Sequence, residues 1–299
     1  MPLETLSDYL SELADTVLDA VLRHAWQGLR NRHRETQSFA VIGYGKLGGK
    51  ELGYASDLDI IFLYDDPAPE AGEVYARFGQ RINHWLNSPT AAGLLYETDL
   101  RLRPDGASGL LVSSVEAFED YQRHKAWMWE HQALTRARFC AGDAAVGKKF
   151  EAIRHAILCQ PRDLAELKRE VLVMRQKMLD GHPNDSGLFD IKHDCGGIVD
   201  VEFLVQFLVL AYAGQHEALA RNIGNIALLG EAGALGLIPQ ALAQQAADCY
   251  RSYRREQHRI RLGGDNRSRM DYRQVASMAN TVLQLWNLVF DSPMTASGA

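Results

Sequence analysis

Two acidic residues follow a pair of glycines, and their spacing suits the binding of a metal ion and a phosphate chain. Asp57 and Asp59 stand two residues apart within an apolar run, so on a β-strand their side chains project from the same face. Because like charges held this close repel each other, we expect a hard cation such as Mg²⁺ between them. A turn at Gly48-Gly49 would bring backbone amides close to phosphate oxygens. The alternative is a solvated strand end without a ligand.

A second segment with alternating polarity favours the functional interpretation. We expect a strand over residues 94–102. Residues 96–104 alternate in polarity, with Glu97, Asp99, Arg101 and Arg103 on one face. Carboxylates on this face would hold metal, and guanidinium groups would meet phosphate oxygens. Together with the first two carboxylates, Asp99 would complete a two-metal site for phosphoryl or nucleotidyl transfer. A ladder of salt bridges between neighbouring strands is the alternative.

A carboxylate in the second half of the chain is a further candidate. Residues 198–213 are apolar on nearly every side, which predicts a buried helix, yet they include Asp200, Glu202 and Gln206. Asp200 lies in the first turn, where the helix dipole stabilises a negative charge. Glu202 lacks that stabilisation, and a buried unpaired carboxylate is costly. We expect Glu202 to reach the nucleotide site, at a metal, a metal-bound water or an arginine; a buried salt bridge between this helix and the sheet is the alternative.

The remaining pattern predicts an α+β protein, with a small mixed β-sheet and helices followed by a mostly α-helical domain. Helices are expected over 3–34 and 70–87, and strands over 39–43, 57–64, 94–102 and 110–112. Later helices are expected over 114–140, 143–158, 163–181, 197–213, 223–233, 239–262 and 271–290. We therefore expect a catalytic core with an N-terminal helix over residues 1–113. Residues 114–299 would form a helical domain that contributes to the active site and to regulation.

The composition argues against several classes of protein. A formal net charge of −6 does not suit a chain that follows a nucleic-acid backbone. The longest apolar run, residues 203–213, is too short to span a bilayer, and no basic leader precedes an apolar segment at the N-terminus. The four cysteines lack the spacing of a disulfide framework or a zinc site. We expect a cytoplasmic protein with no membrane or nucleic-acid partner.

Three longer strings resemble a known family. They are residues 43–59, which contain both glycines and the first two carboxylates, residues 96–104 around Asp99, and Gly196-Gly197-Ile198-Val199-Asp200-Val201-Glu202-Phe203. In this order they resemble glutamine synthetase adenylyltransferase, within the polymerase-β-type nucleotidyltransferase superfamily. The resemblance covers nearly the whole chain from about residue 5.

The resemblance implies that AMP moves from ATP to a tyrosine hydroxyl of glutamine synthetase, with release of pyrophosphate. It implies Mg²⁺, or alternatively Mn²⁺, at Asp57, Asp59 and Asp99, and it implies PII signalling proteins and glutamine as regulators. Asp99 would also accept the proton of the attacking hydroxyl.

Other residues would bind the triphosphate in such an enzyme. Ser56 and Lys46 would add hydrogen bonds near the diglycine turn, and Arg101 and Arg103 would neutralise charge on the leaving group. Glu202 would complete the nucleotide site from the helical domain.

Enzymes of this family have two similar halves, one that adds AMP to glutamine synthetase and one that removes it. The removing half tends to read Arg-Val-Asp and Ile-Arg-Glu-Ile-Glu where this chain has residues 97–99 and 198–202. We therefore expect the C-terminal, AMP-adding half. The alternatives are the AMP-removing half, a uridylyltransferase acting on PII, and a regulatory domain without catalysis.

Overall fold

The computed structural model describes residues 1–291 apart from Ala55, Ala92 and Asn266. Ala55, which belongs to the motif at 43–59, and residues 292–299 of the expected helical domain lie outside the described residues. The chain divides into two compact units that meet between residues 157 and 158. This division replaces the boundary expected between residues 113 and 114, because a later strand joins the sheet of the first unit.

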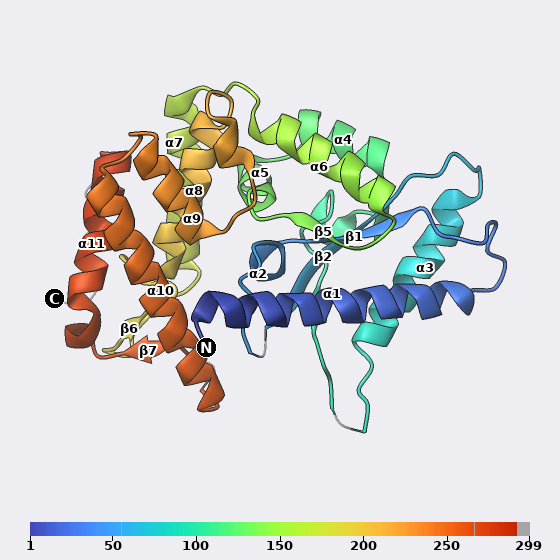
Figure 1. Ribbon diagram of the computed structural model, residues 1–299, viewed down its shortest axis with the longest axis horizontal. Coiled ribbons are helices and arrows are strands. Elements are labelled where there is room, and N and C mark those ends of the chain that lie inside the picture. Colours follow the sequence, from blue (N-terminus) through green and yellow to red (C-terminus); the bar gives the residue numbers. More distant parts are fainter. Residues whose placement is uncertain (55, 92, 266, 292–299) are drawn as a thin grey trace. The chain divides into compact units, whose positions relative to one another are not determined.

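The first unit is built on a mixed β-sheet (Figure 1). Its central strand β2 (Leu58–Tyr64) pairs antiparallel with β1 (Phe39–Gly43), and β1 pairs antiparallel with β5 (Arg138–Gly142). The other edge of β2 pairs in parallel with two short strands, β3 (Thr98–Asp99) and β4 (Val112–Ser114). β1 is buried along its whole length and β2 along most of it, which is why both read as nearly continuous apolar runs.

Helices cover the sheet of the first unit. α1 (Leu3–Gln27) and α3 (Ala71–Leu86) lie below it in Figure 1, with α4 (Val115–His124) and α6 (Ala144–Leu158) above it. α1 and α3 turn apolar stripes towards β1 and β2, as the period of 3.6 residues requires. The first unit also contains the single turn α2 (Gly45–Gly48), the turn η1 (Gly106–Ser108) and the short helix α5 (Met128–Leu134).

The second unit is helical, with a two-stranded ribbon. Its helices are α7 (Leu164–Asp180), α8 (Ile198–Tyr212), η2 (Glu217–Ala220), α9 (Asn225–Ala234), α10 (Gln240–Leu262) and α11 (Tyr272–Phe290). The strands β6 (Phe189–Asp190) and β7 (Arg269–Met270) pair antiparallel. α8 is buried on nearly all sides because α7, α9, α10 and α11 surround it.

Most of the expected elements are present, and three differ. The first helix ends at Gln27 rather than at residue 34. The helix expected over 114–140 is wrong, because this segment forms α4, α5 and the start of β5. The strand expected over 94–102 is reduced to the two residues of β3. None of the described helices has the length and apolar character that crossing a bilayer requires.

Candidate active site

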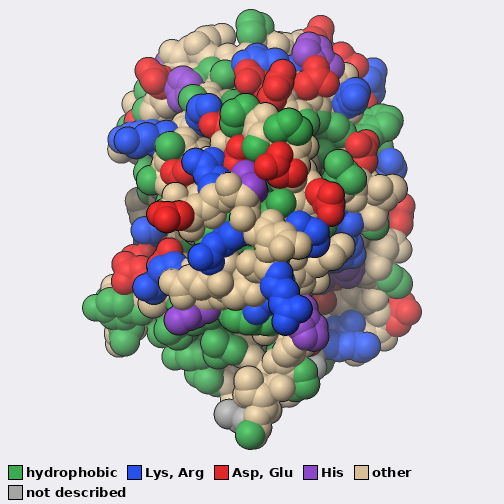
Figure 2. Space-filling view, turned by 90° about the vertical axis from the view of Figure 1, so that its right-hand side faces the viewer, with side chains coloured by type: hydrophobic (Ala, Val, Ile, Leu, Met, Phe, Trp, Pro, Cys, Tyr) green, Lys and Arg blue, Asp and Glu red, His purple; other side chains and the backbone are tan. Residues whose placement is uncertain are grey.

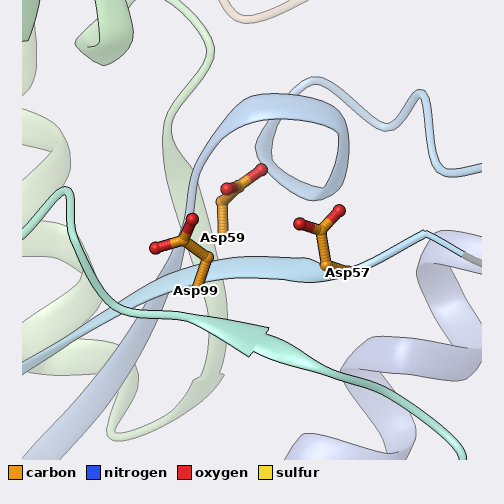
Figure 3. A group of neighbouring side chains, drawn as sticks. All are labelled: Asp57, Asp59 and Asp99. Atoms are coloured by element: carbon orange, nitrogen blue, oxygen red, sulfur yellow. The ribbon is translucent and has the colours of Figure 1, made fainter.

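Three carboxylates meet at the start of β2. Asp57 precedes the strand, Asp59 lies in it, and the parallel pairing of β2 with β3 sets Asp99 directly beside Asp59. Each carboxylate offers an oxygen, and the three oxygens lie within 4.8 Å of one another. Figure 3 shows the three side chains on the same side of β2 and β3. A set of ligands made only of carboxylate oxygens suits Mg²⁺ or Mn²⁺ rather than a soft metal.

The surroundings of Asp59 disfavour its negative charge. Burial, and then the negative charges of Asp57 and Asp99, raise the pKa of Asp59 from 3.8 to about 6. The positive charges of Arg136 and Lys46 offset part of this increase. A cation between the carboxylates would remove the repulsion, so the electrostatics of the site fit the binding of a divalent ion.

Asp99 has a counter-charge in Arg101. The Arg101 guanidinium donates to both carboxylate oxygens of Asp99, with Nε 3.0 Å from Oδ1 and 2.9 Å from Oδ2. The Arg101 amide donates to the same carboxylate at 2.9 Å. These hydrogen bonds hold the pKa of Asp99 below its usual value. The Arg101 side chain is 80% exposed, so its guanidinium has room to turn towards a ligand.

The two glycines expected to contact phosphate serve the turn itself. The Gly48 amide donates to the Tyr44 carbonyl at 2.8 Å, and the Gly49 amide donates to the Gly45 carbonyl at 3.0 Å. A Cβ at Gly48 would lie 2.0 Å from the carbonyl oxygen of Arg136. Both amides are engaged in the helical turn, and the absence of a side chain at Gly48 permits close packing. A contact between this turn and a phosphate chain stays a prediction.

Gly45 is a site residue that the sequence analysis missed. Its φ of 53° lies in the left-handed region, which glycine adopts without strain. A Cβ at this position would lie 2.4 Å from Oδ2 of Asp59. Any side chain here would therefore displace the central carboxylate. The sequence has several glycines in this region, and their spacing alone does not show which one lies beside Asp59.

The remaining residues expected around the triphosphate lie in different settings. Lys46 is close enough to Asp59 to lower its pKa. The Ser56 hydroxyl is buried and accepts a hydrogen bond from the Gly53 amide at 3.2 Å. Arg103 donates to carbonyls of the turn after β3, those of Leu100 (2.7 Å), Ala107 (3.0 Å) and Gly109 (3.3 Å). The expected alternation of Asp99, Arg101 and Arg103 along one strand face is wrong, because β3 ends at Asp99.

A buried ion pair behind the turn is a second feature that the sequence analysis missed. Nη2 of Arg136 lies 2.8 Å from Oε2 of Glu51, and both side chains are largely buried. Arg136 precedes β5 and packs against Gly48 and Gly49. Its charge also lowers the pKa of Asp59, so it links the packing of the turn to the electrostatics of the site.

The two acidic residues of α8, a helix of the second unit, have different partners. Asp200 forms a fully buried ion pair with Arg175 and accepts a hydrogen bond from the Gly196 amide at 2.5 Å. These partners give Asp200 a structural role. Oε1 of Glu202 accepts a hydrogen bond from the Tyr250 hydroxyl at 3.2 Å, and that hydroxyl accepts one from Asn225 at 2.9 Å. A role for Glu202 at the nucleotide site stays a prediction.

Comparison with known proteins connects this geometry to a family. The family model described as glutamate-ammonia ligase adenylyltransferase matches residues 1–153, which include all three carboxylates. The chain belongs to this family. A second family model, described as GlnD PII-uridylyltransferase, matches residues 165–281 in the helical unit.

The chain also has several curated relatives that carry the same name. The chain is similar to proteins named bifunctional glutamine synthetase adenylyltransferase/adenylyl-removing enzyme from three bacteria. It is 58% identical to that of Nitrosomonas europaea, over 96% of this chain and 32% of the relative. It is 59% identical to that of Aromatoleum aromaticum, over 98% and 31%, and 57% identical to that of Chromobacterium violaceum, over 99% and 33%. The chain thus spans about a third of the length of these relatives.

Proposed function

We propose that the chain transfers AMP from ATP to a tyrosine hydroxyl of glutamine synthetase and releases pyrophosphate. The observation that supports this function is the meeting of three carboxylate oxygens within 4.8 Å, in the unit that matches the adenylyltransferase family. ATP and the tyrosine acceptor come from the family resemblance and from the names of the relatives.

Asp57, Asp59 and Asp99 would hold the divalent cation, Mg²⁺ or Mn²⁺. When bound, such an ion neutralises charge on the triphosphate and makes an attacking hydroxyl more acidic. A phenol has an unperturbed pKa near 10, so Asp99 would assist by accepting its proton. Arg101 would leave Asp99 and meet a phosphate oxygen, where its fork of donors stabilises the charge that develops on the leaving group.

A transfer assay with labelled nucleotides tests this proposal. The chain is incubated with Mg²⁺, purified glutamine synthetase or PII, and ATP or UTP labelled at the α-phosphate. We expect label from ATP on glutamine synthetase. The D59N variant should lose the reaction, whereas D8N, which changes an exposed aspartate of α1, should keep it.

The same assay separates the competing functions. With glutamine synthetase that already carries AMP as the protein substrate, loss of AMP from its tyrosine without transfer from ATP would assign the AMP-removing activity instead. Label from UTP on PII would favour a uridylyltransferase, which the match of the helical unit makes the second candidate. Transfer that survives D59N would contradict the role of the carboxylates. We also propose PII and glutamine as regulators, and their effect would appear as a change in the rate of labelling.

A further inference from the structure

Asp99 lies on a strand that is too short to hold it in place by backbone pairing alone. β3 pairs with β2 at two positions, Leu58 with Thr98 and Asp59 with Asp99, and the Leu58 amide donates to the Glu97 carbonyl at 2.8 Å. A metal ligand must be held within about 0.5 Å of its productive position. Further contacts to β3 are therefore needed to hold Asp99 in place.

An amide clamp at the end of α3 supplies these contacts; we use this term for Asn83, Asn87 and Thr98. The Thr98 hydroxyl donates to Oδ1 of Asn83 at 2.8 Å and accepts from Nδ2 of Asn87 at 2.7 Å. The Thr98 amide donates to Oδ1 of Asn87 at 3.3 Å. Nδ2 of Asn87 also donates to Oδ1 of Asn83 at 2.9 Å, which closes the cluster.

The clamp rests on a rigid support. Asn83 lies in the last turn of α3, and Asn87 caps its C-terminus. The opposite side of α3 is fixed in the core of the first unit by buried side chains, among them Tyr75, Phe78 and Ile82. The clamp thus ties the two residues of β3 to a well-packed helix.

The direction of a strand side chain connects the clamp to the candidate active site. Thr98 and Asp99 are consecutive in β3, so their side chains point to opposite faces. The hydrogen bonds that hold the Thr98 side chain on one face therefore also fix the direction in which the Asp99 side chain points on the other face. We propose that Asn83, Asn87 and Thr98 are positioning residues that hold Asp99 in the geometry needed to bind a divalent cation. This inference rests on the proposed function, since it assigns the clamp to the metal site of that reaction.

The binding of Mn²⁺ to the full chain tests this role without relying on activity. Free Mn²⁺ is measured by electron paramagnetic resonance in the absence of nucleotide, and thermal unfolding is followed in parallel. T98V keeps the shape of the side chain and removes the hydroxyl, whereas T98S keeps the hydroxyl. N87A removes the amide from an exposed position. T16V is the matched control, because the hydroxyl of exposed Thr16 bonds a carbonyl of its own helix at 2.8 Å.

We expect T98V and N87A to weaken Mn²⁺ binding about tenfold, the lower end of the range for groups that orient metal ligands. T98S and T16V should bind Mn²⁺ as the unsubstituted chain does. Unchanged Mn²⁺ affinity in folded T98V and N87A would overturn the positioning role and leave the proposed function intact, even if their melting temperatures fall. If the unsubstituted chain does not bind Mn²⁺, both the clamp proposal and the proposed metal site are overturned.

Discussion

Replacement of Asp59 by asparagine should stabilise the metal-free protein while it abolishes activity. In the folded chain the pKa of Asp59 is about 6, compared with an ordinary value of 3.8. This difference corresponds to about 3 kcal/mol by which the ionised carboxylate disfavours folding above pH 7. Asparagine has a similar shape and no charge, so D59N removes the cost of burying the charge and the repulsion from Asp57 and Asp99. Because the asparagine amide still loses some hydration, about 3 kcal/mol is the upper limit of the gain.

The pH dependence of this gain identifies its cause. The folded form holds the Asp59 proton more tightly than the unfolded chain, so the unsubstituted protein gains stability as the pH falls through about 6. The gain is complete below 3.8, where the carboxyl is protonated in both states. The advantage of D59N should therefore be largest above pH 7 and shrink to about 0.5 kcal/mol at pH 4.

Urea denaturation in EDTA at pH 8 and at pH 4 measures both effects. Comparing D59N with the unsubstituted chain at each pH cancels the titration of other groups, and D8N serves as a control that changes an exposed charge. Equal or lower stability of D59N at pH 8 would refute the cost assigned to the ionised Asp59 carboxylate. So would an advantage that stays constant between the two pH values.

Other substitutions test further residues within each unit. G45A should lower the rate of AMP transfer about 100-fold, because its Cβ would have to push the Asp59 carboxylate away by roughly 1 Å; normal transfer rates would contradict this close approach. R101A should tighten Mn²⁺ binding by up to about fivefold, because an exposed ion pair worth under about 1 kcal/mol no longer competes for the third carboxylate. Weaker Mn²⁺ binding in R101A would oppose that reasoning. D200N should lower the free energy of unfolding of the second unit by about 3 kcal/mol, because it leaves buried Arg175 without its counter-charge. Chemical denaturation followed by circular dichroism measures this loss, and a change below about 1 kcal/mol would count against it.

The meeting of the three carboxylates follows from patterns that the sequence displays. The spacing of Asp57 and Asp59 and the apolar run after them predict the strand β2. The alternation around Asp99 predicts a second strand that carries an acid. Only the pairing of the two strands depends on contacts distant in the chain, and β2 pairs with β3 so that Asp59 and Asp99 are adjacent.

The length of β3 could not be read from its own residues. The edge of β2 that carries β3 at residues 58–59 carries β4 at residues 62–64. A longer strand over residues 94–102 would need the same edge. Residues after Asp99 turn away instead, and Arg103 holds that turn by donating to three carbonyls. The local alternation of polarity therefore predicted a longer strand, but β4 occupies the part of the β2 edge that such a strand would need.

The strand β5 was missed for a related reason. Its sequence, Arg138–Gly142, has no β-branched residue and follows a segment with helical periodicity. Its pairing partner β1 lies about a hundred residues earlier. Arg138 is held by Asp15 of α1, with Nη1 and Nη2 at 2.8 and 2.9 Å from the two carboxylate oxygens. Contacts of this range are not visible in a local pattern.

Two aspartates illustrate how structure separates function from support. Asp59 and Asp200 both lie in apolar runs, and burial raises the pKa of each. Asp200 has a fixed counter-charge in Arg175, so its negative charge is neutralised by a residue of the same unit. Asp59 has two further carboxylates as neighbours, and Arg136 and Lys46 offset only part of their effect, so a cation from outside the chain would stabilise its charge. The same change from aspartate to asparagine should therefore have opposite effects on stability, positive at Asp59, where it removes a buried charge beside two like charges, and negative at Asp200, where it leaves Arg175 without its counter-charge.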